Sequence, residues 1–309
     1  MNHLLEGCCS FGRQMPATHA NTAAIWTERR KASLPRRDQR NRIRGSDKMK
    51  PHPWLTWALA VAVGASPMLL HAQCRAQSAD HQVAVFELYT SEGCDSCPPA
   101  DRWFSALGRS NDASQEVALA FHVDYWDRLG WRDRFGNAAY TERQHEQATR
   151  QRAAFVYTPQ VLLQGHDFTG WRKPGEAASE IAAVNTRAPR AHIDVVAAPA
   201  EGRATAVDVR VRITEARDRA HATIGVALLQ DDLASEVKAG ENAGKRLAHD
   251  HVVRQWRADA LRFDASGEAS DRLVLPLPKD AGPLSVAVLV ENEASGGVLQ
   301  AVAMPLCAR

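Results

Sequence analysis

The sequence predicts two folded domains, an α/β domain followed by an all-β domain, and three observations lead to this prediction. A buried-strand pattern over residues 83–88 runs through a short turn into Cys-x-x-Cys at the start of a helical pattern. Strand and helix patterns then alternate up to residue 185, whereas only short strand-like runs separated by turn residues follow. The length of 309 residues also exceeds that of one small domain.

The first 72 residues differ from the rest of the chain in charge. They hold 11 of the 38 Lys and Arg residues but only 4 of the 36 Asp and Glu residues, so the remainder carries a net charge of −5. This balance gives no reason to expect nucleic acid as a partner. Met49 and Lys50 precede an apolar run over residues 54–70, and small residues suited to cleavage follow at Ala72 and Ala76. This pattern is typical of a secretory signal peptide.

We therefore expect translation to start at Met49, with residues 1–48 as an upstream or disordered extension and residues 49–76 as the signal peptide. The alternative is an uncleaved N-terminal anchor, although Gly64 and Pro67 interrupt a run of borderline length. Both alternatives place the folded part outside the cytoplasm, so we expect a periplasmic or secreted protein. If the signal is cleaved, no stable membrane insertion is expected.

The pairing of two cysteines near the ends of the folded part depends on the cleavage site. Cleavage after Ala72 would retain Cys74, which could then pair with Cys307, whereas cleavage after Ala76 would leave Cys307 single. Disulfides persist outside the cytoplasm, so either state is compatible with the expected compartment.

Residues 77–189 are expected to form the α/β domain. The expected elements are, in order, a strand (83–88), a helix (98–107), a strand (117–123), a helix (141–154), a strand (160–164), a return strand (166–169) and a helix (176–185). This order, with Cys-x-x-Cys leading the first helix, is similar to that of the thioredoxin fold. In that fold a cis-proline faces the disulfide, and Thr158-Pro159 stands just ahead of the third strand. Proline readily adopts a cis peptide bond, and a trans-proline that begins a strand is the alternative.

Residues 190–309 are expected to form the all-β domain, an antiparallel β-sandwich, with the boundary near Pro189. Turn residues such as Gly282-Pro283 separate its short strand-like runs. The expected strands are 192–196, 205–213, 222–229, 252–256, 272–277 and 284–290. This part offers no constellation for catalysis, so we expect a binding or support module.

Several long segments resemble the DUF1223 family of secreted thioredoxin-like proteins. The resemblance rests on residues 87–101, on His122-Val123-Asp124-Tyr125-Trp126-Asp127 with Gly130-Trp131, and on Arg143-Gln144, Tyr157-Thr158-Pro159-Gln160, Gly240-Glu241-Asn242-x-Gly244 and Val252-Val253-Arg254. It covers roughly residues 83–300. The family is named for having no assigned function, so the resemblance implies a thioredoxin-like fold and an extracytoplasmic setting but no substrate.

The Cys-x-x-Cys pair carries the predicted chemistry. Cys94 is the expected exposed nucleophile, because a helix N-terminus favours a thiolate, and Cys97 is the resolving thiol. Attack by Cys94 on a substrate disulfide gives a mixed disulfide that Cys97 then releases. The sequence thus predicts a thiol–disulfide oxidoreductase-like protein with thiol- or disulfide-bearing clients, an unidentified redox partner and no cofactor. A permanently closed structural disulfide is the alternative, although so short a ring constrains the unfolded chain little.

Three neighbours of the pair are assigned roles. Pro159 would align a substrate strand beside Cys94. Glu87, on the strand that enters the site, is a candidate proton relay, and a solvated glutamate at a sheet edge is the alternative. Asp95 places a negative charge near the thiolate and opposes the effect of the helix N-terminus, so the direction of electron flow stays open.

A copper-binding or copper-delivery protein is the second hypothesis, with Cys94, Cys97 and His122 as ligands. A lone histidine at a strand end is more often part of a hydrogen-bonded structure, which is the alternative for His122. A third hypothesis is a non-catalytic scaffold whose β-sandwich binds a partner protein.

Overall fold

The structure, a computed structural model, describes residues 73–110, 112–280 and 282–307. The predicted extension and most of the predicted signal peptide lie outside the described residues. Within these ranges, no helix combines the length and the apolar character that crossing a membrane requires.

The described residues from 73 to 185 form alternating strands and helices. In order they are β1 (Cys74–Gln77), β2 (Ala84–Thr90), α1 (Pro98–Ser110), β3 (Glu116–His122), α2 (Ala138–Arg150), β4 (Gln160–Leu163), β5 (His166–Asp167) and α3 (Glu176–Asn185), with 3-10 helices η1 (Asp127–Leu129) and η2 (Thr169–Arg172). Helix α2 begins earlier than predicted because Asn137 caps it, its side chain accepting a hydrogen bond from the Ala139 N–H.

The rest of the chain consists mainly of strands. In order the elements are β6 (His192–Ala200), β7 (Ala204–Arg212), α4 (Ala216–Arg219), β8 (Ala222–Gln230), β9 (Leu233–Glu236), β10 (Arg246–His249), β11 (Val252–Ala260), β12 (Glu268–Pro276), β13 (Leu284–Asn292) and β14 (Val298–Pro305). The predicted runs have counterparts among these strands, whereas β9, β10 and β14 were not predicted.

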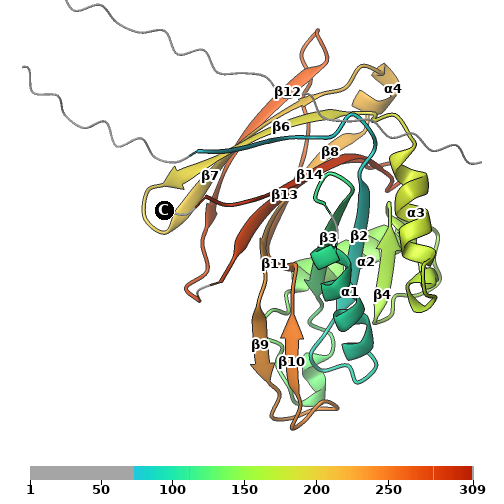
Figure 1. Cartoon of the computed structure of the whole chain (residues 1–309), viewed down its shortest axis with the longest axis vertical. Coiled ribbons are helices and arrows are strands. Elements are labelled where there is room, and N and C mark those ends of the chain that lie inside the picture. The colour runs from blue at the N-terminus through green and yellow to red at the C-terminus, as the bar shows by residue number, and fades with distance from the viewer. Residues whose placement is uncertain (1–72, 111, 281, 308–309) are drawn as a thin grey trace, which may run out of the picture. The chain divides into compact units, whose positions relative to one another are not determined.

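The predicted fold class, an α/β thioredoxin-like domain followed by an all-β antiparallel sandwich, is wrong. Strands make up 41% of the structure and helices 19%, and the strands form large mixed sheets. An eight-stranded sheet runs in the order β14-β13-β8-β11-β3-β2-β4-β5, and a second sheet has the order β1-β6-β7-β12 (Figure 1).

The predicted fold class is wrong because β3 pairs with β11, which joins strands of the two predicted domains into one sheet. Val252 of β11 lies beside Ala120 of β3 in a parallel pair, and the Ala120 N–H donates to the His251 carbonyl at 2.8 Å. A free strand edge presents unpaired N–H and C=O groups that another strand can satisfy. The sequence patterns identify both strands but carry no information on which strand pairs with which.

The central strand β2 is buried on both faces. Phe86 and Leu88 pack on one face against Ala100 and Phe104 of α1. Residues of odd number, such as Tyr89, point to the opposite face and into a different core cluster. Helix α1, which follows the Cys-x-x-Cys motif, therefore covers only the face with the even-numbered residues.

The two sheets enclose a further core between them, formed by residues such as Val209, Val226 and Val288. A disulfide between Cys74 and Cys307 closes one end of this region, joining β1 to the segment after β14. Of the two alternatives for these cysteines, the structure contains the paired one.

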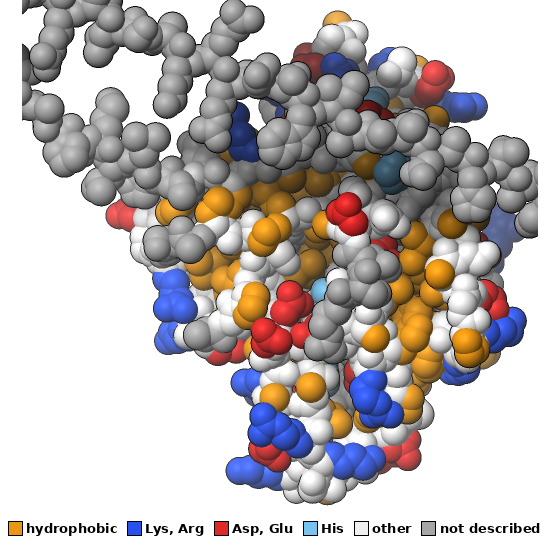
Figure 2. Space-filling model, in the orientation of Figure 1, with side chains coloured by type: hydrophobic (Ala, Val, Ile, Leu, Met, Phe, Trp, Pro, Cys, Tyr) orange, Lys and Arg blue, Asp and Glu red, His pale blue; other side chains and the backbone are white. Residues whose placement is uncertain are grey.

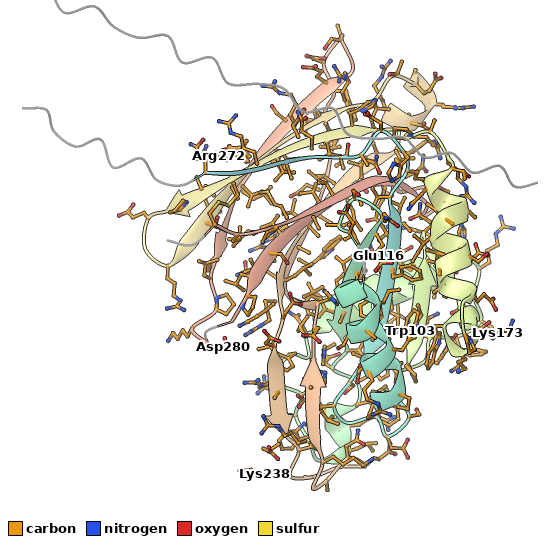
Figure 3. The ribbon with its side chains drawn as sticks, viewed as in Figure 1. Trp103, Glu116, Lys173, Lys238, Arg272 and Asp280 are labelled. Atoms are coloured by element: carbon orange, nitrogen blue, oxygen red, sulfur yellow. A yellow bond between two sulfur atoms is a disulfide. The ribbon has the colours of Figure 1, made fainter. Side chains whose placement is uncertain are left out.

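Strands β9 and β10 form a separate two-stranded sheet. This hairpin projects from the body of the molecule in Figure 1, and Lys238 lies at its tip in Figure 3. Figure 2 shows Lys and Arg side chains at this end of the molecule, where Lys238 and Arg246 are exposed. Exposed charges of this kind discourage a free strand edge from pairing with another chain.

A buried ion-pair cluster connects α2, β2 and β13. The Arg143 guanidinium donates to both carboxylate oxygens of Glu87 at 2.8 and 2.9 Å and to Glu291 at 2.9 Å. Arg143 is 5% exposed and Glu87 is 1% exposed. The charges are thus removed from water and depend on one another for compensation.

Replacing Arg143 with Leu should lower the free energy of unfolding by about 3–5 kcal/mol, because two carboxylates would remain buried without their cation. Urea denaturation measures the effect. The matched control is Arg150→Leu, also on α2, whose pair with the half-exposed Glu146 spans 3.5 Å and should contribute only about 0–0.5 kcal/mol. Equal losses of unfolding free energy in Arg143→Leu and Arg150→Leu would contradict the assignment of Arg143 to a buried ion-pair cluster.

Candidate functional site

Three connections meet at one edge of the large sheet. Thr90 at the end of β2 lies beside His122 at the end of the parallel strand β3, so the loops after both strands leave from the same edge. Tyr89 lies beside Gln160 at the start of the antiparallel strand β4. The Cys-x-x-Cys loop, the loop after β3 and the Thr158-Pro159 peptide are brought together for this reason.

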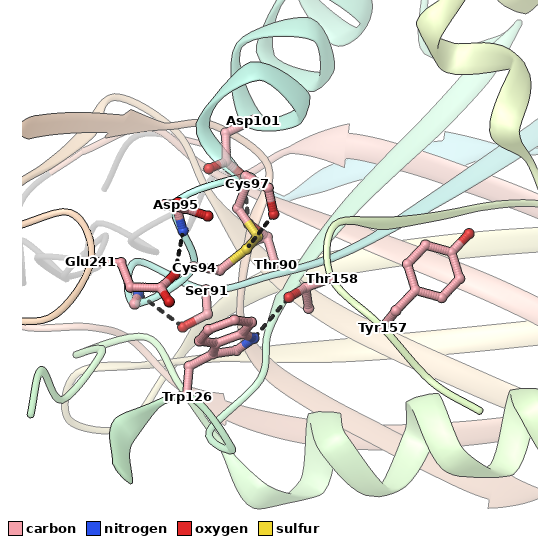
Figure 4. Close-up of a disulfide and its surroundings, with 12 residues drawn as sticks. Thr90, Ser91, Cys94, Asp95, Cys97, Asp101, Trp126, Tyr157, Thr158 and Glu241 are labelled. Carbon is pink, nitrogen blue, oxygen red and sulfur yellow. Dashed lines mark hydrogen bonds between the residues drawn. A yellow bond between two sulfur atoms is a disulfide. The ribbon is translucent and has the colours of Figure 1, made fainter. Parts of the chain in front are cut away.

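Cys94 and Cys97 form a disulfide in this loop, with their Cα atoms 5.4 Å apart (Figure 4). The Cys97 carbonyl accepts hydrogen bonds from the N–H groups of Ala100 and Asp101 at 2.9 and 3.1 Å, so Cys97 lies at the start of α1 as predicted. The Ser96 hydroxyl lies 3.3 Å from the Cys94 sulfur. The expectation that Cys94 is exposed is wrong, because both cysteines have 0% exposure.

The Thr158-Pro159 peptide bond is cis, as the sequence predicted. Thr158 is held by the Trp126 indole, whose Nε1–H donates to the threonine hydroxyl at 2.8 Å. Figure 4 shows Trp126 and Thr158 next to the disulfide. Trp126 also packs against Gly93, where an added Cβ would lie only 3.0 Å from the tryptophan Cβ. Pro159 is therefore placed at the disulfide edge of the sheet, with Cys94 and Cys97.

Glu87, the candidate proton relay, does not lie at the disulfide edge of the sheet. Its odd number puts its side chain on the face of β2 that α1 does not cover, where it binds Arg143 and accepts a hydrogen bond from the Tyr89 hydroxyl at 2.8 Å. The solvated alternative for Glu87 is excluded by its burial. Burial raises the pKa of Tyr89 well above its ordinary value, and the nearby Glu87 charge adds to this shift.

Asp101 is the acidic side chain that α1 places on the disulfide side of the sheet. It follows Cys97 by four residues, one helical turn, and is 7% exposed. The Thr90 hydroxyl donates to its carboxylate at 2.7 Å. Burial raises the pKa of Asp101, although His249 and His122 nearby oppose the shift. The sequence reasoning missed Asp101, and its spacing from Cys97 was the available signal.

Glu92 anchors the loop just before Cys94. The Trp131 indole donates to its carboxylate at 2.7 Å, and His249 of β10 lies 3.4 Å from the other carboxylate oxygen. Burial is the largest influence and by itself would raise the pKa of Glu92, but His249, Ser235 and the Trp131 indole together outweigh it, and the pKa is lowered. A buried carboxylate held in its charged form thus stands beside the Cys-x-x-Cys loop.

The turn between β9 and β10 makes a second set of contacts with this loop. The Asn242 side-chain amide donates to the carbonyls of Glu92 and Cys94 at 2.9 and 2.8 Å, and the Asp95 N–H donates to the Glu241 carboxylate at 3.1 Å. Sequence reasoning assigned no role to Asn242 or Glu241. The available signal was their position between Gly240 and Gly244, whose φ angles of 73° and 81° define a tight turn.

His122 is buried at the end of β3. Its Nδ1 lies 2.7 Å from the Asp133 carboxylate, and its ring centroid is 4.9 Å from that of His249. Among the described residues, no group of three or more His, Cys, Asp or Glu side chains is arranged to hold a metal ion. The ligand set Cys94, Cys97 and His122 is therefore not brought together, and the geometry gives the copper hypothesis no support.

Asp133 and His122 form a charged pair. Burial is the largest influence and by itself would lower the pKa of His122, but the charge and hydrogen bond of Asp133, with the Asp101 and Glu92 charges, together raise it. For Asp133, burial is outweighed by the charge and hydrogen bond of His122 together with the hydrogen bonds from the Glu92 and Phe135 N–H groups, so its pKa is lowered. Asp133 also accepts hydrogen bonds from the N–H groups of Glu92 and Phe135, both at 2.9 Å.

The fold and site define a mostly β protein with a buried Cys-x-x-Cys disulfide at a helix N-terminus. The family described as protein of unknown function (DUF1223) matches residues 85–291, and the chain belongs to this family. No curated protein matches the chain in sequence.

Two of the solved structures that are similar to this chain cover most of its length. A structural genomics target from Agrobacterium tumefaciens is 25% identical, with 75% of this chain and 97% of that chain covered and a TM-score of 0.49. HBP35 of Porphyromonas gingivalis is 13% identical, with 74% of this chain and 76% of that chain covered and a TM-score of 0.58. The second likeness extends to the fold alone.

The His122–Asp133 pair predicts a pH-dependent stability. A histidine with a raised pKa stabilises the folded state below its unfolded pKa of about 6.5, and this contribution is lost as the pH rises through the folded value. His122→Gln keeps a donor for Asp133 but removes the charge. Near pH 5.5 it should therefore cost about 1–3 kcal/mol of unfolding free energy, and less near pH 8.5.

Urea denaturation at the two pH values measures this difference. His145→Gln is the control, because His145 is exposed on α2. A cost for His122→Gln that does not change with pH would show that the pair contributes as a neutral hydrogen bond.

Proposed function

We propose that the Cys94–Cys97 pair is a redox-active disulfide and that the protein exchanges it with external thiols or disulfides. The position of the disulfide at the N-terminal end of α1 carries the proposal. There the positive end of the helix dipole stabilises a cysteine thiolate. The proposal rests on this local geometry and does not depend on membership of a particular superfamily.

Each exchange step conserves thiols and electrons. In the oxidising direction, one thiolate of a client dithiol attacks a sulfur of the pair, and the Cys94–Cys97 bond breaks as a mixed disulfide forms. The second client thiolate attacks the mixed disulfide and releases the cysteine. The client leaves as a disulfide, the pair holds two electrons and two protons, and the reverse sequence reduces a client. We place this chemistry in the periplasm or outside the cell, and the second disulfide, Cys74–Cys307, is consistent with such a compartment.

The reduction potential of the pair tests the proposal. The full chain is equilibrated against glutathione and dithiothreitol buffers, and alkylated Cys94 and Cys97 are counted separately from the other cysteines by peptide mass spectrometry. We expect a reversible transition between about −270 and −120 mV, the span of known dithiol oxidoreductases. Cys97→Ser should accumulate a mixed disulfide with glutathione at Cys94. A pair that stays oxidised below about −300 mV would instead be a structural disulfide.

The charge of Asp95 should tune this potential. Asp95→His removes a negative charge next to Cys94, stabilises its thiolate and so favours the reduced form, which raises the potential by roughly 30 mV. The same buffers measure the change. Glu201→His, in the exposed turn between β6 and β7, is the matched control for the charge change and should leave the potential unchanged. A potential that is unchanged or lower in Asp95→His would contradict the electrostatic explanation.

A further inference from the structure

The disulfide is not accessible in the described conformation. Cys94 and Cys97 are both 0% exposed, whereas Asp95 and Ser96 between them are exposed. An in-line attack on a disulfide needs a thiolate to reach one of the sulfurs. Any exchange therefore requires a covering segment to move.

We define the cover as residues 237–245, the turn that joins β9 to β10. Asn242, itself 0% exposed, binds the carbonyls on both sides of Gly93, those of Glu92 and Cys94. The Lys245 ammonium holds the Asn242 side-chain oxygen at 2.8 Å and so fixes the orientation of its amide. Figure 4 shows Glu241 beside Asp95 and Cys94.

The β9–β10 hairpin, which carries the cover, is attached to the body at its base as well as at its tip. At the base, Leu233 packs with Phe135 and Val252, and the Arg134 guanidinium donates to the Ala234 carbonyl at 2.9 Å. The tip is held to the Cys-x-x-Cys loop by the hydrogen bonds of Asn242 and Glu241. A two-stranded ribbon is only marginally stable by itself, so the tip can open at a lower free energy than global unfolding.

We propose that the cover is a specificity element of the disulfide site. Asn242 and Glu241 position the Cys94 loop, and the cover admits low-molecular-weight thiols to the disulfide while excluding dithiols carried on folded proteins. This inference rests on the proposed function. A small thiol needs only a slight displacement of the tip that keeps these hydrogen bonds, whereas a folded protein needs the tip released from the Cys-x-x-Cys loop.

The admitted reaction is balanced as follows. The thiolate of a small thiol attacks Cys94, the Cys94–Cys97 bond breaks, and Cys97 leaves with the electron pair and takes up a proton. A second small thiol attacks the mixed disulfide and releases Cys94. The products are the reduced pair and a small-molecule disulfide.

The rate constants for reduction of the oxidised full chain test this inference. The probes are dithiothreitol, as a small dithiol, and a reduced thioredoxin, as a dithiol on a folded protein. In the native protein we expect dithiothreitol to react at least about 100-fold faster. Asn242→Ala removes two hydrogen bonds worth about 1 kcal/mol each, and Glu241→Ala removes one hydrogen bond to a charged acceptor worth about 1.5 kcal/mol. Each variant should therefore raise the thioredoxin rate by about tenfold or more and narrow the ratio of the dithiothreitol rate to the thioredoxin rate.

Two variants are controls. Glu241→Gln keeps an acceptor oxygen for the Asp95 N–H and should keep the native ratio of the two rates. Lys238→Ala changes an exposed side chain of the same turn and should also leave the ratio unchanged. If the ratio of the dithiothreitol rate to the thioredoxin rate is the same in Asn242→Ala and Glu241→Ala as in the native protein, the inference is overturned but the proposed function stays intact. If neither reagent reduces any of these proteins, the proposed function itself fails.

Hydrogen exchange of the Asp95 amide gives a measurement that does not depend on redox chemistry. This N–H donates to Glu241, so its exchange should be at least about tenfold faster in Glu241→Ala and unchanged in Glu241→Gln. The Leu88 amide in the buried strand β2 serves as the internal check that the variant is folded. An Asp95 amide equally protected in Glu241→Ala would show that the contact does not hold the cover in place.

Discussion

The pairing of β11 with β3 is the constraint on which the site depends. Because only two residues separate the end of β10 from Val252, where β11 starts, the pairing of β11 with Ala120 also fixes the β9–β10 hairpin beside the Cys-x-x-Cys loop. The side chains that contact this loop from β10 and its turn, including Asn242 and His249, come from about 150 residues further along the chain. The disulfide site is thus completed by a distant segment, and its geometry requires the continuous eight-stranded sheet.

Buried polar groups then determine how rigid the loop is. Burial of a charged group is costly unless hydrogen bonds or opposite charges compensate it. Around the loop the compensation is shared: Asp133 binds both His122 and the Glu92 N–H, while Glu92 binds Trp131 and lies next to His249. Movement of one group would leave others unpaired, so these contacts hold the loop in one conformation. The tip of the hairpin lacks such mutual support and is the part that can move.

The sequence predicts the local features of this site and misses the long-range ones. The strand before Cys94 and the start of α1 at Pro98 each follow from nearby residues, through apolar patterns and the special geometry of proline. The cis bond at Pro159 was expected instead from the similarity of the element order to that of the thioredoxin fold. The identity of the strand that pairs with β3 does not follow from nearby residues, because strand patterns contain no information on pairing. Glu87 illustrates a second limit: in a strand buried on both faces, alternation does not reveal which face the helix will cover. The sequence could have identified Asp101, because a residue four positions after Cys97 lies one helical turn further along α1.

The contacts of the cover also influence the electrostatics of the pair. The carboxylate of Glu241 accepts a hydrogen bond from the Asp95 N–H, so a negative charge occupies the N-terminal end of α1 while the cover is closed. A thiolate on Cys94 would be stabilised by the same helix end, and two negative charges close together repel each other. The closed cover therefore disfavours the thiolate and favours the uncharged disulfide. In the proposed exchange, shielding and electrostatics therefore act in the same direction, and both favour the buried, oxidised pair.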